Sequence, residues 1–288
     1  MLDLLLHTPP QNVGSTIFFG IIGLLIGSFL NVVIHRVPKM MEREEENDIA
    51  IASGKDPVHT DRYDLMLPRS ACPKCGHQIT ALENIPVISY LVLRGKCSGC
   101  QTAISPRYPL IEALTGALTA YVIWHFGSGI DGLAAMVFVW FLIALTWIDF
   151  DTQLLPDSLT LPLMWIGLLV NTEYRFARLD HAVIGAAVGY MSLWSINAAY
   201  RALRGHDGMG YGDFKLLAAL GAWLGWMNLP FIILAASVVG SAYGIFMLLG
   251  KRLGWSIPFA FGPFLTGAGL IALLWGNQIT NAYLGLYR

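Results

Sequence analysis

The chain has few charged residues: 13% of its 288 residues are Asp, Glu, Lys or Arg, whereas 55% are hydrophobic. A soluble domain carries about 25% charged residues, so this composition excludes an ordinary soluble protein and indicates an integral membrane protein. The net charge of −1 provides no overall field that would attract nucleic acid, and we expect no nucleic-acid partner. The sequence also lacks a Gly-x-Gly-x-x-Gly motif and a basic segment before its first apolar run. These absences exclude a Rossmann-type domain and a cleaved signal peptide.

Apolar runs occupy most of the chain. The first, at 13–34, carries no charge and reaches the roughly 20 residues that a helix needs to cross a bilayer. Two further long runs lie near the C-terminus, at 229–250 and 257–275. The weaker or shorter runs are 108–126, 133–148, 159–170, 182–199 and 216–227. We therefore predict an all-α polytopic membrane protein with about eight transmembrane helices. Two of them, 159–170 and 216–227, are short enough that they start below the membrane surface or line a water-filled cavity.

Lys and Arg are unevenly distributed along the chain. Residues 1–34 contain none, and residues 35–108 contain ten of the eighteen. Because basic loops stay in the cytoplasm, we predict that the N-terminus is outside and that the basic segment is cytoplasmic. With eight spans, Asp149 and Asp213 then lie at the same inner face. The predicted domains are an N-terminal end with the first span (1–34), a small cytoplasmic domain (35–107) and a seven-helix membrane domain (108–288).

Four cysteines in the cytoplasmic segment form two C-x-x-C pairs. They are Cys72, Cys75, Cys97 and Cys100. Each pair points two thiolates at one centre, and two pairs complete a tetrahedral zinc site. Four sulfur ligands leave no open position, so the single zinc ion is predicted to be structural; the alternative is a redox-active or merely reduced set of thiols. Gly76 and Gly99 suit tight turns after or within the pairs. Residues 39–64, with their run of glutamates, are predicted to be a solvated, mobile excursion.

Two aspartates stand at the ends of apolar runs. Asp149 terminates one run, and Asp213 lies in Gly210-Tyr211-Gly212-Asp213. Ionisable groups in spans are costly and usually functional. Two carboxyl groups about 3 Å apart cannot both ionise, so one would activate water while the other polarised a carbonyl. Gly210 and Gly212 would let a substrate backbone approach. The alternative is that each aspartate is an interfacial residue or a helix cap.

Other ionisable residues in these runs have several possible roles. Asp151 and Asp157 lie further into the connection, and Asp157 suits the N-cap of the next span. Asp149 and Asp151 could instead chelate a divalent metal ion.

Glu112 and Lys215 are further supporting candidates. Glu112 lies one turn into the second span, where it could pair with an arginine such as Arg107 or help shape the active-site cavity. Lys215 follows Asp213 by two residues. It would either stabilise ionised Asp213 or extend its ammonium group to the lipid headgroups.

Several motifs occur in a fixed order along nearly the whole chain. They are the segments 27–36, 69–75, 85–91, 93–97 and 105–109, then Glu112, Asp149-Phe150-Asp151, Leu155-Pro156-Asp157, the segment 210–215, Pro258-Phe259 and the segment 261–264. Together they resemble the type IV prepilin peptidases, which are bifunctional leader peptidase/N-methyltransferases of the GxGD aspartyl protease class. The four-residue G-x-G-D motif alone is weak, but the ordered set is very specific.

The resemblance implies a function and a location. Asp149 and Asp213 would be the catalytic pair of a membrane protease domain, and the four cysteines would bind zinc in a cytoplasmic domain. The substrates would be prepilins and type II secretion pseudopilins, cut after a glycine at the cytoplasmic face of the bacterial inner membrane. The new N-terminal residue, usually Phe, would then be methylated from S-adenosylmethionine. For the methyl donor, the segment Arg94-Gly95-Lys96 is the candidate site.

Three other classes of function remain open from the residues themselves. The first is a lipid-phosphate transferase that binds Mg²⁺ through Asp149, Asp151 and Asp157. The second is a transporter or channel whose acidic residues relay ions. The third is a non-catalytic assembly subunit with a zinc-containing docking loop. Membrane lipids surround the protein in each case.

Overall fold

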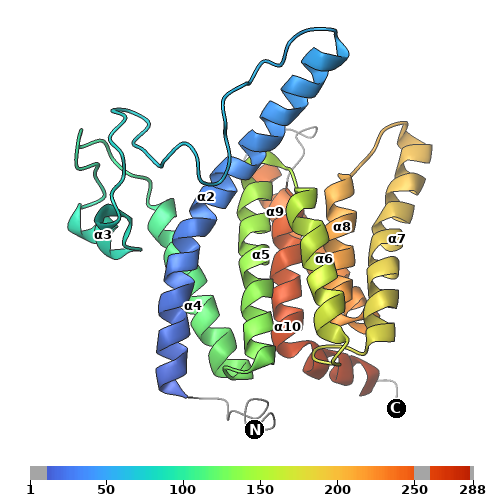
Figure 1. Ribbon diagram of the computed structural model, residues 1–288. Helices are drawn as coiled ribbons and strands as arrows, with labels where there is room; N and C mark the ends of the chain where they lie inside the picture. The colour runs from blue at the N-terminus through green and yellow to red at the C-terminus, as the bar shows by residue number, and fades with distance from the viewer. Residues whose placement is uncertain (1–11, 250–259, 286–288) are drawn as a thin grey trace. The chain divides into compact units, whose positions relative to one another are not determined.

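The computed structural model describes residues 12–249 and 260–285, and in these residues the chain is α-helical without a β-ladder. The long helices in Figure 1 are α2 (Val13–Ala52), α4 (Arg107–Phe126), α5 (Ile130–Thr152), α6 (Asp157–Asn171), α7 (Leu179–Arg204), α8 (Tyr211–Leu224), α9 (Leu229–Leu249) and α10 (Gly262–Gly285). The short ones are η1 (Leu82–Asn84), α3 (Ile88–Val92) and η2 (Trp226–Asn228). The predicted all-α class is confirmed. Pro258-Phe259, Lys251, Arg252 and Arg288 lie outside the described residues.

Within residues 12–249 and 260–285, four stretches of helix are long and apolar enough to cross a membrane: α2, α5, α7 and the stretch that joins η2 to α9. Each of the eight predicted spans overlaps one long helix. However, α6 and α8 have only 15 and 14 residues, fewer than the roughly 20 needed for a full crossing. Eight crossings therefore stay a prediction.

The chain divides into two compact units, Met1–Ala144 and Leu145–Arg288, with α5 beginning in the first and ending in the second. In the first unit, α2 and α4 pack at backbone distance. A Cβ added at Gly23 would lie 2.6 Å from the Thr119 side chain, and one added at Gly27 would lie 2.7 Å from the Glu112 Cα. Small residues permit this close approach, as is common between membrane helices.

The prediction of a mobile excursion at residues 39–64 was wrong for residues 39–52, which form the C-terminal part of α2. The helix continues to Ala52, and the following segment runs back along it (Figure 1). The buried Arg36 guanidinium donates hydrogen bonds to the carbonyls of Asp64 and Pro68, and Asn47 exchanges hydrogen bonds with His59. The glutamate run was misinterpreted because charged residues also form the exposed face of a helix that continues beyond the apolar span.

In the second unit, α8 packs against α6 and α7. From Asp213 to Leu224, every residue of α8 except Lys215 is buried. A Cβ added at Gly185 of α7 would collide with the Gly221 carbonyl oxygen of α8, so the two backbones are in direct contact. This contact requires glycine on both helices. It allows α8 to be buried against its neighbours.

Asn171, at the end of α6, fixes the C-terminal end of α8. Its Nδ2 donates to the carbonyls of Ala222 and Trp223 at 2.9 and 2.8 Å. Its Oδ1 accepts from the N–H groups of Phe176 and Ala177, both at 3.0 Å. The fully buried amide therefore uses both its donor and its acceptor group.

We expect Asn171→Ala to lower the free energy of unfolding by about 3 kcal/mol, because buried backbone groups lose their partners. Asn277→Ala, at an exposed position of α10, should change it by less than about 0.5 kcal/mol. Denaturant unfolding in detergent micelles measures both. Equal effects of the two variants would contradict this role for Asn171.

Candidate functional site

The two predicted catalytic aspartates are both buried in the second unit. Asp149 lies in the last turn of α5 and is 4% exposed; its Oδ2 accepts a hydrogen bond from the Gly262 N–H at 2.8 Å. Asp213 is the third residue of α8 and is 8% exposed. Its Oδ1 is buried and has no hydrogen-bond partner among the residues that the structure describes. That oxygen remains able to bond to water or to a substrate.

Leu155 lies beside both aspartates. A Cβ added at Gly212 would lie 2.7 Å from the Leu155 Cβ, and one added at Gly262 would lie 3.3 Å from the Leu155 Cδ2. Gly212 precedes Asp213, and Gly262 is bonded to Asp149. The two carboxyl groups are close enough for their negative charges to repel each other. The structure therefore brings together two residues that are 64 positions apart in the sequence.

The two glycines of the motif differ in their surroundings. Beside Gly212 the space is filled by Leu155 of the same chain rather than being open to a substrate. Among the residues that the structure describes, a Cβ added at Gly210 would meet only the Asp213 Oδ2, at 3.9 Å. Close approach from outside is therefore compatible with Gly210 and not with Gly212.

Asp157 and Lys215 form an ion pair. Lys215 Nζ donates to the two carboxylate oxygens of Asp157 at 2.6 and 2.7 Å. Asp157 is the first residue of α6, and Pro156 occupies the N-cap position for which Asp157 was predicted. The Lys215 charge is thus compensated by Asp157, not directed only at Asp213 or at lipid headgroups. Asp151 is exposed in the last turn of α5.

Glu112 connects the segment between α2 and α4 to α4 itself. It is 9% exposed on α4, and its Oε2 accepts the Val87 N–H at 2.7 Å. Val87 precedes α3 and has a φ of 61°, an uncommon conformation for a β-branched residue. The hydrogen bond to Glu112 stabilises that turn. This bond to the Val87 backbone is a third role, and the two predicted ones, a pair with Arg107 and a part in the active-site cavity, stay predictions.

The cysteine pairs form two similar turns, the first knuckle (residues 71–78) and the second knuckle (residues 96–103), each closed by one antiparallel bridge. Gly76 has a φ of 72° in the first, as its predicted turn role requires. In the second, Gln101 and not Gly99 has a positive φ, of 59°. A Cβ added at Gly99 would lie 3.2 Å from a side chain of the first knuckle. Gly99 thus allows the two knuckles to approach.

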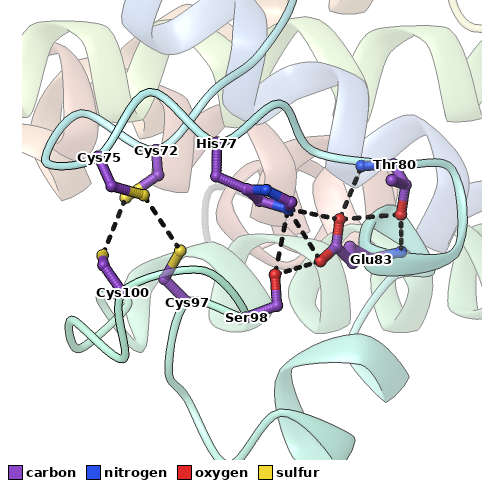
Figure 2. Close-up of polar contacts among 8 residues, drawn as sticks. All are labelled: Cys72, Cys75, His77, Thr80, Glu83, Cys97, Ser98 and Cys100. Atoms are coloured by element: carbon purple, nitrogen blue, oxygen red, sulfur yellow. Dashed lines mark hydrogen bonds and ion pairs between the residues drawn. The ribbon is translucent and has the colours of Figure 1, made fainter.

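The four thiols converge with the dimensions of a zinc site (Figure 2). The Cys72 and Cys100 sulfurs are 3.8 Å apart, those of Cys75 and Cys97 are 3.9 Å apart, and all four lie within 4.8 Å of one another. Tetrahedral coordination with Zn–S bonds of about 2.3 Å places sulfurs about 3.8 Å apart. The donor set and its spacing therefore fit one metal ion. Among the described residues, this is the one group of potential ligands that converges in this way; Asp149, Asp151 and Asp157 do not form such a group there.

The thiols of the cluster differ in their acidity. Hydrogen bonds from Thr102, first with its hydroxyl, lower the pKa of the Cys100 thiol to about 6. A backbone hydrogen bond of His77 lowers the pKa of Cys75, but the neighbouring thiols raise it to about 12. A divalent cation would favour the ionised form of all four thiols, because only thiolates bind it well.

Outside the thiols, a set of hydrogen bonds joins the two knuckles (Figure 2). Glu83 accepts from the Thr80 N–H at 2.9 Å and from the Thr80 hydroxyl at 2.8 Å. Ser98 of the second knuckle donates to the same carboxylate, and His77 of the first lies 3.2 Å from it. Hydrogen bonds from Ser98 and then Thr80 lower the pKa of Glu83 to about 2. This ionised carboxylate orients both knuckles.

Gly95, in the predicted methyl-donor segment, is required by the local backbone conformation. Gly95 has a φ of 67°, and a Cβ there would lie 2.8 Å from the Tyr90 hydroxyl. Its N–H donates to the Tyr90 carbonyl, and its carbonyl accepts the Ile104 N–H. Arg94 and Lys96 are exposed on either side. Gly95 therefore serves the fold of the loop, and only its two cationic neighbours present side chains to a ligand.

Sequence reasoning missed the residues that orient the aspartates and the cysteines. Gly262 stood in a recognised motif, so a signal for its importance was present but its partner Asp149 was not evident. Glu83 and Ser98 carried no signal, because single polar residues in a loop of low hydrophobicity are usually solvated.

Comparison with known proteins identifies the family of the chain. The bacterial peptidase A24 N-terminal domain matches residues 21–126, and the type IV leader peptidase family matches residues 136–245. A prepilin leader peptidase/N-methyltransferase of Pseudomonas aeruginosa is 52% identical over 285 residues, covering 99% of this chain and 97% of the relative.

Relatives from other bacteria have the same name. One from Aeromonas salmonicida is 53% identical, with 97% of each chain covered, and one from Dichelobacter nodosus is 49% identical, with 92% of this chain and 93% of the relative covered. No solved structure matches the chain. Family models match both halves of the chain, and relatives match it along nearly its full length. The chain therefore belongs to the type IV leader peptidase family.

Proposed function

We propose that this protein is a prepilin leader peptidase and N-methyltransferase of the bacterial inner membrane, with Asp149 and Asp213 as its catalytic pair. The observation that carries the proposal is the meeting of two buried, mutually repelling carboxyl groups at the ends of α5 and α8. Membership of the family and the names of its relatives supply the substrate class.

The pair supports hydrolysis of a peptide bond without a metal ion in the reaction. An ionised carboxylate takes a proton from water as the water oxygen attacks the scissile carbonyl carbon. The protonated partner polarises that carbonyl, and a proton is then delivered to the departing amine nitrogen as the C–N bond breaks. Gly262 orients Asp149 through its N–H. Asp213 presents Oδ1, which has no bond to other described groups, to water or the substrate.

The substrate class follows from the family. Prepilins and pseudopilins combine a short basic leader, a Gly–Phe-type junction and an apolar helix. The apolar helix would pack among the spans while the basic leader stays in the cytoplasm, where the predicted topology places both aspartates. Cleavage after the glycine leaves a new N-terminal amine at this face.

Methylation of the new N-terminus is the second proposed activity. S-adenosylmethionine, when bound, supplies an electrophilic methyl group to a neutral amine. Arg94 and Lys96 are candidates to hold its carboxylate, since both are exposed next to the zinc site. The protein would bind and orient the donor, and it would keep the substrate amine at the same membrane face.

Eight crossings with a periplasmic N-terminus remain the topology that we propose. The domains are then 1–34, 35–107 and 108–288, with one adjustment: α2 runs without interruption from the first domain into the second. Zinc is proposed as the metal of the four-cysteine site, where it would be structural, because the four thiolates fill its coordination sphere.

Asp149→Asn and Asp213→Asn are each expected to lower the rate of cleavage by about 10²- to 10⁴-fold, because each removes a proton-transferring group. Asp151→Asn and Asp157→Asn should have milder effects. Cleavage of a purified prepilin in detergent, followed by mass spectrometry, measures both cleavage and methylation. Strong residual cleavage in either of the first two variants, at normal protein levels, would rule out the assignment.

Gly262→Ala tests the orientation of Asp149. The new Cβ would lie 2.7 Å from the Asp149 Oδ2, and we expect cleavage to slow by about 10²-fold, as a displacement of about 1 Å can cause. Gly267→Ala is the matched control, because a Cβ at that position of α10 meets no atom of the described part of the chain within 4 Å. Similar rates for the two variants would disprove the contact.

Elemental analysis of the purified protein should find about one zinc per chain. Cys72→Ser combined with Cys75→Ser should lose the metal and make residues 66–107 more sensitive to proteolysis in inverted vesicles. We expect methylation to suffer more than cleavage, and brief treatment with EDTA to leave cleavage intact. Rapid loss of activity in EDTA with recovery in Mg²⁺ would instead favour a metal-dependent phosphotransferase.

A further inference from the structure

The loop between α7 and α8 leads directly into the motif that contains Asp213. It includes Gly205, Gly208 and Gly210, and each glycine adds backbone freedom. Gly205 ends α7 with a φ of 81°, and its N–H donates to the Arg201 carbonyl at 2.8 Å. The sequence of this loop therefore leaves open where α8 begins, and other contacts must fix it.

Asn197 of α7 supplies these contacts. It is 5% exposed, and its amide makes two hydrogen bonds to consecutive residues of the loop. Nδ2 donates to the Asp207 Oδ1 at 2.8 Å, and Oδ1 accepts from the Gly208 N–H at 2.8 Å. A buried amide with both its donor and its acceptor group bonded holds the loop in one orientation.

Two neighbours on α7 support the same loop. Arg201, one turn after Asn197, lies 3.8 Å from the Asp207 Oδ1. The Tyr200 ring packs so closely on Gly208 that a Cβ there would lie 2.8 Å from it. The ring also contacts the ring of His206 edge-on, with centroids 5.5 Å apart. The last turns of α7 therefore form a surface that fits this loop.

The held loop is next to the Asp213 carboxyl group. Only Met209 separates Gly208 from Gly210, whose carbonyl accepts the Asp213 N–H at 3.2 Å. A Cβ at Gly210 would lie 3.9 Å from the Asp213 Oδ2. A shift of the loop at Asp207 and Gly208 is thus transmitted through two residues to the start of α8.

We propose that Asn197 is a positioning residue for Asp213, acting through its two hydrogen bonds to Asp207 and Gly208. The inference rests on the proposed function, because it takes Asp213 to be one of the catalytic pair.

The test is steady-state cleavage of a purified prepilin by full-length variants in detergent. Asn197→Ala is expected to lower kcat by about 10- to 100-fold and to change KM by less than about twofold, since the carboxyl group is displaced while the substrate surface remains. Ser195→Ala is the matched control. Ser195 is exposed on the same helix, and its hydroxyl donates to the Ser192 carbonyl of that helix rather than to the loop, so the kcat of this variant should stay within about twofold of wild type.

An exchange of donor and acceptor separates positioning from a general loss of folding. Asn197→Asp alone places two carboxylates face to face and should behave like Asn197→Ala. Combined with Asp207→Asn, the new carboxylate can accept from both the Gly208 N–H and the new amide. The double variant should recover kcat to within about threefold of wild type. Failure to recover, in a protein with wild-type thermal stability, would overturn the inference.

Hydrogen–deuterium exchange gives a readout that does not depend on activity. In Asn197→Ala, amides in residues 205–213 should exchange faster, and those of α9 should not change. Unchanged exchange, or faster exchange with an unchanged kcat, would refute the positioning role. A wild-type protein that cleaves no prepilin, or full activity of Asp213→Asn, would overturn the proposed function instead, and the exchange would still decide whether Asn197 holds the loop.

Discussion

The backbone contact between α7 and α8 is the constraint on which the aspartate pair depends. Gly185 and Gly221 lie so close that a Cβ on either would collide with the other's carbonyl group. This contact lets α8, only 14 residues long, be buried along nearly its whole length. Asp213 is carried into the interior with it. There its carboxyl group is largely shielded from bulk water, as is that of Asp149.

A short helix needs its ends held, and two asparagines do this for α8. Asn171 binds the carbonyls of Ala222 and Trp223 at the C-terminal end. Asn197 binds the loop before the N-terminal end. A primary amide suits both places, because it offers donors and an acceptor in one plane without carrying a charge. Uncharged hydrogen-bonding groups therefore hold both ends of the helix that carries Asp213. The positive charge of Lys215 is compensated by Asp157.

The segment that contains the four cysteines uses a different kind of stabilisation. It has few buried apolar residues, with Cys97 as one of them, so a hydrophobic core alone would not hold it. The converging thiols, the hydrogen bonds around Glu83 and the bond from Val87 to Glu112 replace that core. A metal ion bound by the thiolates would complete the fold without taking part in the reaction.

The all-helical class and the positions of the two cysteine pairs and the two aspartates could be predicted from the sequence, because apolar runs and closely spaced motifs are local patterns. It did not show that residues 39–52 extend α2, since charged residues suit an exposed helix as well as a loop. Only the tertiary structure revealed Gly262 as the partner of Asp149, 113 residues away, and Asp157 as the partner of Lys215, 58 residues away. Pairings over such distances depend on how the helices pack. The sequence around a single residue in an apolar run does not show which distant group will be its partner.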